Sequence, residues 1–356
     1  MKVFDTDHDF CFYFLDRVSR TFALTIRLLP VDLGFIVANA YLIARIADTI
    51  EDDLTLCSEE KVRQLKLLDE GLTSEAKILE FLDSFKVYTS TADEEELLRN
   101  TDRVFEIFYG FEENIRNIIT RWIREMISGM IHFSETYESG VRIKTMNELH
   151  RYCYFVAGTI GYMLTEMFAL HSKQASLNDL LVNCEDYGVA LQLINILRDI
   201  RKDASLENNI YIPQQELEKW GAQHSDIKAN KNRKGTTQVL TAILSDAEKK
   251  LKNGISYYNS IPHKDIQIRL FLGTTLLLSF ATLREMKSQP EKLLNRSPVK
   301  ISRWEVLTLA SLIKVPYAHL FLGAISKMVL WSGWAMIFKP FTNNFFLGAA
   351  SAKRSI

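Results

Sequence analysis

Hydrophobic residues recur along most of the chain every three to four positions, the spacing that places side chains on one face of an α-helix. Short breaks containing proline, glycine, asparagine or serine separate these stretches, and no run alternates like a half-buried strand. The pattern predicts an all-α protein. Its long helices are expected over residues 8–28, 33–53, 58–84, 94–135, 147–171, 177–203, 236–258, 265–288 and 303–328.

The breaks do not divide the chain into separate domains, because none is a linker rich in proline, glycine and serine, and no segment repeats. The 356 residues include only 15 glycines and 7 prolines, which favours long helices over many short strands. We expect one helical domain over residues 1–305, followed by an apolar segment over residues 306–356.

The apolar C-terminal segment has a composition of its own. Its uncharged run over residues 328–338 is too short to cross a bilayer as a helix. Lysines border apolar stretches that include Trp331 and Trp334, a combination typical of a membrane interface. We expect this segment to lie against a membrane surface or a partner, with ordinary core packing as the alternative.

Charge and cysteine content narrow the classes of function. The chain has 43 Lys and Arg against 44 Asp and Glu, which argues against a nucleic-acid binder that relies on bulk basic charge. Its four scattered cysteines lack the spacing of a zinc site and suit a reducing compartment. Since the acidic N-terminus has no signal-peptide pattern, we expect a protein on the cytoplasmic side, attached peripherally or C-terminally to a membrane. The oligomeric state stays open, with a monomer among the options.

A polar stripe runs along the second predicted helix, which is otherwise apolar. At about 100° per residue, Tyr41, Arg45, Asp48 and Asp52 fall on one side, with Glu51 beside them. A helix that is apolar on its remaining sides is expected to be buried. Buried carboxylates lose hydration and repel one another, so they need a compensating cation, and one arginine cannot balance them.

A second stripe of this kind lies near the end of the sixth predicted helix. Asn195, Asp199 and Asp203 recur every four residues and therefore share a face, whereas the opposite side is apolar. The residues that flank this stripe are Gln192, Arg198 and Lys202.

Two such stripes would form an oxygen-rich cage if they faced one another across a cavity. Oxygen ligands without Cys or His suit Mg²⁺, which keeps water ligands and bridges to phosphates. Arg45, Arg198 and Lys202 would meet the remaining phosphate charge. The implied chemistry is ionisation of a diphosphate ester, with the carbocation held in an apolar cavity. The alternative is that each stripe is a helix end with exposed acids.

Two other segments carry weaker signals. The run over residues 152–158 places aromatic side chains beside small residues, and a glycine inside a helix costs ~1 kcal/mol relative to alanine. That cost indicates a close approach either of another helix or of a ligand. Near the N-terminus, Arg20 lies in an apolar, aromatic stretch, where a snorkelling surface arginine is the default interpretation.

Four blocks, in order, resemble the squalene/phytoene synthase family: SRTF at 19–22, YLIARIADTIEDD at 41–53, YCYFVAG at 152–158 and LQLINILRDIRKD at 191–203. The resemblance covers roughly residues 8–305. It implies the isoprenoid (terpenoid) synthase fold, a single helical domain around a central cavity. It also implies a prenyltransferase that joins two prenyl diphosphates head to head with Mg²⁺, for which Mn²⁺ can substitute.

The resemblance assigns roles to individual residues. Tyr41 and Tyr152 would lie near the first proton transfer, although a phenol is a poor base at neutral pH and the leaving diphosphate is the alternative acceptor. The metal ligands would be Asp48, Glu51, Asp52, Asn195, Asp199 and Asp203. The catalytic residues would be Tyr41, Tyr152, Asp48, Asp52, Asp199 and Asp203. Substrate or cofactor would be bound by Ser19, Arg20, Thr21, Arg45, Val156, Ala157, Gly158, Gln192, Asn195, Arg198, Lys300 and Arg303.

Within the family, the chain most resembles the members that condense two farnesyl diphosphates through presqualene diphosphate and reduce the product with NADPH. The segment over residues 299–303 is similar to a basic segment that those members use toward NADPH, with Ser302 where an arginine is usual. In contrast, LENNIYIP at 206–213 is as similar to the non-reducing dehydrosqualene and phytoene synthases. Lys202 stands at a position that is usually acidic. A non-catalytic scaffold is disfavoured because both acidic clusters are largely complete.

Overall fold

The computed structural model describes residues 4–84, 91–295, 299–312 and 322–330, without the side chains of Arg20, Thr21 and Arg303. The regular structure of these residues is helical, and the extended pairing among them is an isolated parallel bridge between Arg142 and Ile210. The all-α prediction is therefore confirmed.

The helices come in the following order. The first half contains α1 (Asp7–Val18), α2 (Arg20–Ile26), α3 (Val31–Asp52), α4 (Ser58–Gly71), α5 (Glu75–Ser84), α6 (Ala92–Arg99), α7 (Thr101–Tyr109), α8 (Glu113–Thr136) and α9 (Met146–Cys153). The second half contains η1 (Tyr154–Gly158), α10 (Thr159–His171), α11 (Leu177–Leu181), α12 (Cys184–Leu206), α13 (Gln214–Glu218), α14 (His224–Ala229), α15 (Arg233–Ser260), α16 (Ile266–Ser288), η2 (Pro290–Leu294), α17 (Arg303–Leu312) and α18 (Leu322–Leu330).

Several predicted helices are divided by local capping. The helix expected over residues 8–28 is two helices, because Ser19 is extended and its Oγ accepts a hydrogen bond from the Phe22 N–H, 3.2 Å away. The stretch expected as one helix over residues 94–135 is α6, α7 and α8, and Thr91 and Glu94 form a capping box at the start of α6. The hydrophobic period located the helical segments, but not these breaks within them.

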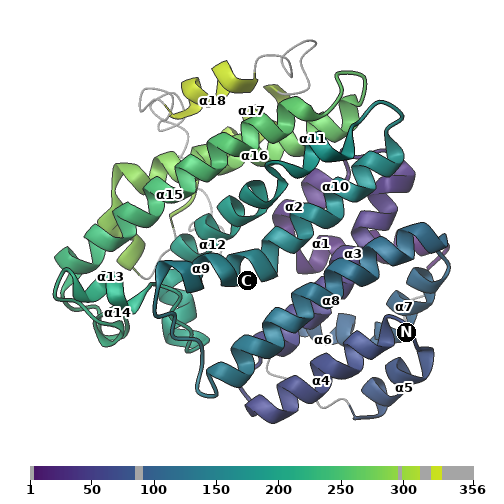
Figure 1. The fold of residues 1–356 in the computed structure, drawn as a ribbon, viewed down its shortest axis with the longest axis horizontal. Helices are drawn as coiled ribbons and strands as arrows, with labels where there is room; N and C mark the ends of the chain where they lie inside the picture. The colour runs from purple at the N-terminus through teal and green to yellow at the C-terminus, as the bar shows by residue number, and fades with distance from the viewer. Residues whose placement is uncertain (1–3, 85–90, 296–298, 313–321, 331–356) are drawn as a thin grey trace, which may run out of the picture.

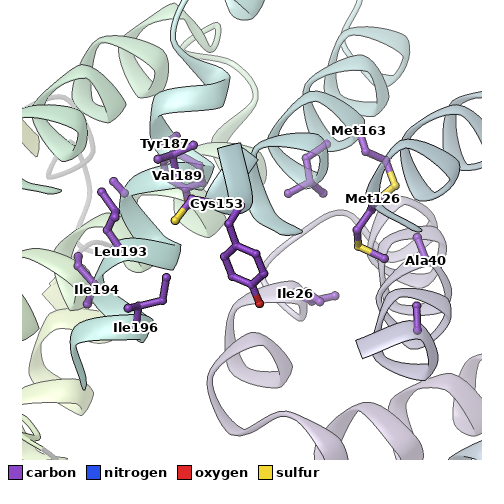
Figure 2. Packing of buried hydrophobic residues seen from close by; sticks show 14 of the residues in the cluster. Ile26, Ala40, Met126, Cys153, Met163, Tyr187, Val189, Leu193, Ile194 and Ile196 are labelled. Atoms are coloured by element: carbon purple, nitrogen blue, oxygen red, sulfur yellow. The ribbon is translucent and has the colours of Figure 1, made fainter. Parts of the chain in front are cut away.

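The long helices pack around one core (Figure 1). α12 packs against α15 and η1, α15 packs against α16, and α8 packs against α4, α10 and η1. Figure 2 shows part of the interior, where side chains of α12, including Tyr187, lie on one side and Met126 of α8 and Met163 of α10 lie on the other. This packing holds α3 and α12, the two helices with polar stripes, on opposite walls of a central cavity.

Three helical stretches are long and apolar enough to cross a membrane by length and composition: Val31–Asp52, Met146–His171 and Ile266–Ser288. Between 56% and 78% of the most apolar window of each is buried inside the protein. The same three stretches contribute to the cavity wall. Their hydrophobicity is therefore accounted for by the core of this fold.

The described part of the C-terminal segment packs on α16. Arg284 of α16 forms a buried ion pair with Glu305 of α17 (Nη1–Oε1 2.8 Å), and its Nη1 also donates to the backbone oxygen of Val329 in α18 at 3.0 Å. The other face of this segment exposes Trp304, Leu307 and Met328. The prediction for Trp331 and Trp334 lies outside the described residues.

Candidate active site

The central cavity has a volume of about 320 Å³, within the range of small-molecule sites. Along both α3 and α12 the charged side chains of its wall lie toward the C-terminal end of the helix, so the cavity has a charged end and a more hydrophobic remainder. The charged and amide side chains are Arg45, Asp48, Asp52, Gln192, Asn195, Arg198, Asp199, Lys202, Asp203 and Glu207. The hydrophobic part includes Phe22, Ile26, Val37, Met126, Met130, Val156, Ile160, Met163, Leu164, Leu191, Ile196 and Phe271.

On the α3 wall, Arg45 organises the polar stripe. Its Nη1 donates to Asp48 Oδ2 at 2.6 Å, and its Nη2 donates to the Tyr41 hydroxyl at 2.9 Å. Glu94 of α6 lies 3.9 Å from the same guanidinium, a neighbour that the sequence pattern did not indicate. Burial raises the pKa of Asp48, and Arg45 opposes that shift.

The acids that adjoin Asp52 face away from the cavity. Glu51 lines a separate space of about 40 Å³ together with Lys61, and its buried Oε1 has no hydrogen-bond partner among the described residues. Burial and the charge of Asp48 raise the pKa of Glu51 to about 8. Asp53 ends α3, because its Oδ1 accepts from the Thr55 N–H at 2.6 Å and the Leu56 N–H at 3.0 Å. Of these three consecutive acids, Asp52 is the one that lines the central cavity.

On the α12 wall, the predicted polar face is complete. Asn195, Asp199 and Asp203 line the cavity, and Arg198 donates to Asp199 Oδ2 through Nη2 at 2.6 Å. One further carboxylate joins them just beyond the helix: Glu207 at the C-cap lines the cavity, although the sequence reasoning missed it. Its spacing of four from Asp203 is the signal that could have found it.

The polar end of the cavity has more negative than positive side chains. Its five carboxylates face only three cationic side chains, so burial and mutual repulsion raise the pKa of Asp52 well above its usual range. The pKa of Asp203 rises to about 8 for the same reasons, because the charges of Glu207 and Asp199 add to the effect of burial. The donor atoms of these side chains are all oxygens, and the cations around them do not balance their negative charge. Such a site fits a hard divalent cation.

The carboxylates do not form a dedicated metal cage. Among the described residues, no group of three His, Cys, Asp or Glu side chains is close enough to hold one ion. Mg²⁺ commonly takes one or two carboxylates and completes its shell with water and phosphate oxygens. The arrangement therefore fits ions that are shared between the protein and a bound diphosphate.

Tyr152 and a tyrosine that the sequence reasoning missed form a stacked pair in the cavity wall. The Tyr152 hydroxyl donates to the Tyr211 hydroxyl at 3.1 Å, and the ring centroids are 4.7 Å apart. Burial raises the pKa of both phenols well above their usual range, and Glu51 and Asp52 raise it further. Both phenols therefore stay protonated at neutral pH.

A π-helical turn carries the predicted motif YCYFVAG into the wall. η1 places Val156 and Ala157 at the cavity, and single π turns of this kind frequently occur at functional sites. Gly158 does not line the cavity; a Cβ there would lie 3.3 Å from Glu185 Cγ of α12. The glycine in this segment thus permits close helix packing, one of the two alternatives that the sequence left open.

The other predicted site residues lie in different places. Ser19 is buried as the cap of α2 and does not line the cavity, and Lys300 is exposed outside it. The predictions for Arg20, Thr21 and Arg303 rest on side chains outside the described part of the structure. Ser302 Oγ accepts from the Glu305 N–H at 3.1 Å and so begins α17.

Comparison with known proteins gives one family. The squalene/phytoene synthase family model matches residues 15–305. The squalene synthase of Schizosaccharomyces pombe is 28% identical over 79% of this chain and 60% of its own length. A lycopaoctaene synthase of Botryococcus braunii is 26% identical over 86% of this chain and 66% of its own. The chain thus spans less than two thirds of the length of these curated relatives.

Solved structures give the same fold. A structure described as TcSQS in complex with a ligand superposes with a TM-score of 0.80 at 24% identity, covering 92% of both chains. A dehydrosqualene synthase superposes with a TM-score of 0.63 at 21% identity, covering 86% of this chain and 95% of its own. The isoprenoid synthase fold predicted from the motifs is therefore confirmed.

Proposed function

The chain belongs to the squalene/phytoene synthase family, and from that premise we propose that it condenses two prenyl diphosphates head to head. The observation that carries the proposal is that one cavity has both charged and hydrophobic side chains in its wall. More specifically, we propose two farnesyl diphosphates as substrates, presqualene diphosphate as intermediate and squalene as the product of reduction by NADPH.

The charged end suits the diphosphate groups. Arg45, Arg198 and Lys202 line it and can each donate hydrogen bonds to phosphate oxygens. When bound there, Mg²⁺ supplies positive charge that stabilises the departing diphosphate. Asp48, Asp52, Asn195, Asp199 and Asp203 are the residues that would hold it, and Glu51 would contribute only if its side chain turned toward the cavity.

The hydrophobic end suits the prenyl chains. Phe22 of α2 and Tyr41 of α3 lie with ring centroids 5.6 Å apart in the wall, and methionines from α8 and α10 extend the apolar surface. Aromatic faces attract a nearby cation, and an apolar wall excludes the water that would quench an allylic carbocation. The first bond-forming step needs both properties.

The proton released on cyclopropane formation needs an acceptor. Tyr152 is a poor candidate, because burial raises the pKa of its phenol and its hydroxyl already donates to Tyr211. We assign the proton to the diphosphate that leaves the first substrate, which carries it away as the C–O bond breaks and the new C–C bonds form. Tyr41 and Tyr152 then shape the site rather than act as bases.

The reductive step involves residues at and just before the start of α17. It depends on Lys300, which is exposed and lies outside the cavity wall, and on Arg303, whose side chain is not described. We therefore derive no hydride step from the described residues. Support comes from the curated relatives, because those of Schizosaccharomyces pombe, Dictyostelium discoideum and Arabidopsis thaliana are all squalene synthases.

Product analysis tests the whole proposal. The full chain is incubated with farnesyl diphosphate and Mg²⁺, with and without NADPH, and the lipids are identified by mass spectrometry. Squalene that forms only with NADPH supports the proposal in full. Identical products with and without NADPH leave the head-to-head reaction standing and contradict the reductive step. Absence of any C30 product contradicts the farnesyl assignment.

We also propose that the protein lies at the cytoplasmic side of a membrane, which it contacts through the C-terminal segment. Trp304, Leu307 and Met328, which are exposed on the packed part of that segment, support this. Co-sedimentation of the full chain with anionic lipid vesicles tests it. Replacement of Trp304 and Leu307 by serine should reduce the bound fraction, and an unchanged fraction would contradict the proposal.

A further inference from the structure

One lysine lies among the carboxylates of both acidic helices. The ammonium group of Lys202 contacts Glu207 Oε1, and both side chains line the cavity. Lys202 is 60% exposed at the edge of the cavity, whereas Glu207 is 18% exposed. Its positive charge acts on Asp48 of α3 as well as on Asp203 of α12. The Lys202 side chain therefore belongs to the cavity wall that also contains the carboxylates of both stripes.

The ion pairs in the cavity show what this lysine changes. Each cationic side chain of the wall is within ion-pair distance of a different carboxylate, and the three pairs are Arg45–Asp48, Arg198–Asp199 and Lys202–Glu207. Asp52 and Asp203 have no such cationic partner in the described part of the chain. Two of the five carboxylates are thus left without a balancing cation. With an acid in place of Lys202, six carboxylates would share two arginines, and four would be left without a balancing cation.

We propose that the Lys202 ammonium group, held by Glu207, is a built-in cation of the diphosphate site and replaces one divalent cation there. This inference rests on the proposed function, because it requires that a diphosphate and divalent ions share the cavity. A lysine ammonium is a compact point charge on a flexible stem, so it can balance carboxylates and phosphate oxygens without recruitment from solution. The protein would then bind fewer divalent ions than one with an acid at position 202.

Counting bound Mn²⁺ tests the inference without relying on turnover. Mn²⁺ bound per chain is measured by electron paramagnetic resonance in the presence of saturating farnesyl thiodiphosphate, a substrate analogue that ionises poorly. We expect Lys202→Glu to bind one more Mn²⁺ than the wild-type chain. In the absence of the analogue, Lys202→Met should bind Mn²⁺ at least about threefold more tightly, because the cavity becomes more negative.

A charge swap and a matched control separate the effect of the Lys202 charge on the Mn²⁺ count from the effect of its side-chain shape. The double variant Lys202→Glu with Glu207→Lys restores one ammonium and one carboxylate, so its Mn²⁺ count should return to that of the wild-type chain. Lys219→Glu breaks a similar pair with Glu216 (2.7 Å) outside the cavity, and its Mn²⁺ count should not change. Thermal unfolding of each variant without ligands verifies that the fold is retained.

Two results overturn the inference in different ways. Equal Mn²⁺ counts and affinities in the wild-type chain and all Lys202 variants contradict the built-in cation, while binding of Mn²⁺ and the analogue leaves the proposed function intact. If the wild-type chain binds neither Mn²⁺ nor the analogue, the proposed function fails together with the inference.

Discussion

Gly188 of α12 lies against the backbone of Ala157 in η1, so close that a Cβ atom at position 188 would be 2.3 Å from the Ala157 oxygen. Real Cβ atoms do not approach a carbonyl oxygen so closely, so any side chain there would push α12 away from the π-helical turn. Because Ala157 and the polar stripe of α12 line the same cavity, this contact fixes the distance between two of its walls.

We predict that Gly188→Ala lowers the free energy of unfolding by about 1–3 kcal/mol, the usual cost of overpacking, and lowers activity by a larger factor than stability alone explains. Urea denaturation and steady-state kinetics measure the two effects. Gly323→Ala in α18 is the control, because the atom nearest to its added Cβ is 3.9 Å away. Equal behaviour of both variants would contradict the proposed role of this contact.

The acids at the end of α3 are predicted to differ in importance. Asp52→Asn should lower kcat at least about 100-fold with little loss of stability, because it removes a potential metal ligand from the cavity wall. Glu51→Gln should cause a much smaller loss, because Glu51 lines the separate small space. Kinetic measurements on both variants at several Mg²⁺ concentrations provide the test. Comparable losses would show that Glu51 turns into the cavity and binds metal, as the family resemblance implies.

The raised pKa values predict that stability falls as pH rises. The pKa of Asp203 is about 8 in the folded chain against about 3.9 for a free aspartate, so the folded state binds this proton more tightly. Its contribution to stability is therefore fully present below about pH 4 and is lost as the pH rises through about 8. In calorimetry with EDTA, Tm should fall between pH 6 and pH 8.5 more steeply for the wild-type chain than for Asp203→Asn. Parallel curves would contradict the assignment.

Tyr152→Phe tests whether the phenol is a base. The variant loses one hydrogen bond to Tyr211 and keeps the ring stack, which should cost about 0.5–1.5 kcal/mol of stability. If the phenol only shapes the site, the rate of presqualene diphosphate formation falls less than about tenfold, since tenfold corresponds to 1.4 kcal/mol. The pH profile should keep its form. A loss of several orders of magnitude would assign the proton transfer to Tyr152.

Lys300→Ala separates the two half-reactions. If Lys300 meets a phosphate of NADPH, the substitution should raise the KM for NADPH about tenfold, which corresponds to the loss of 1.4 kcal/mol. Presqualene diphosphate should form at the wild-type rate and accumulate, because the first half-reaction uses the cavity and not this exposed side chain. Product analysis at limiting NADPH measures both. An equal loss in both half-reactions would indicate a structural role.

The sequence predicted most of the polar residues that line the cavity, but it did not show which neighbouring residues lie inside the wall and which lie outside it. Helical periodicity places Asp48 and Asp52, or Asn195 and Asp199, on one face without any tertiary information, and these residues do line the cavity. Periodicity could not show that Glu51 would point away, because its position lies between the apolar and polar faces of the helix. The predicted helix ended at residue 203, so Glu207, one further turn along, was missed although it continues the same spacing. Tyr211 lies beyond the helix, where periodicity gives no information, and the chain after α12 brings it to the cavity wall.

The missed breaks have a similar origin. Ser19 interrupts a helix because its hydroxyl caps the next one, a local bond that competes with an otherwise uninterrupted hydrophobic period. The wide π-helical turn η1 packs against α12, where a Cβ atom on Gly158 would lie 3.3 Å from Glu185 Cγ, and this contact joins segments far apart in the sequence. Propensity read along one segment contains no information about such a neighbour.

The buried Arg284–Glu305 pair has a practical consequence for anyone who shortens this chain. The family match ends at residue 305, and a cut there is the obvious way to remove the apolar end and improve solubility. However, Leu309, Leu322 and Val329 are almost completely buried in the helices that cover α16. A chain that ends at residue 305 would expose the surface that these residues cover and would make Glu305 the terminal residue, which adds a second negative charge next to its buried pair with Arg284. The shortened protein should therefore aggregate more readily than the full chain, and a soluble form is better sought by replacing Trp304, Leu307 and Met328 with polar residues.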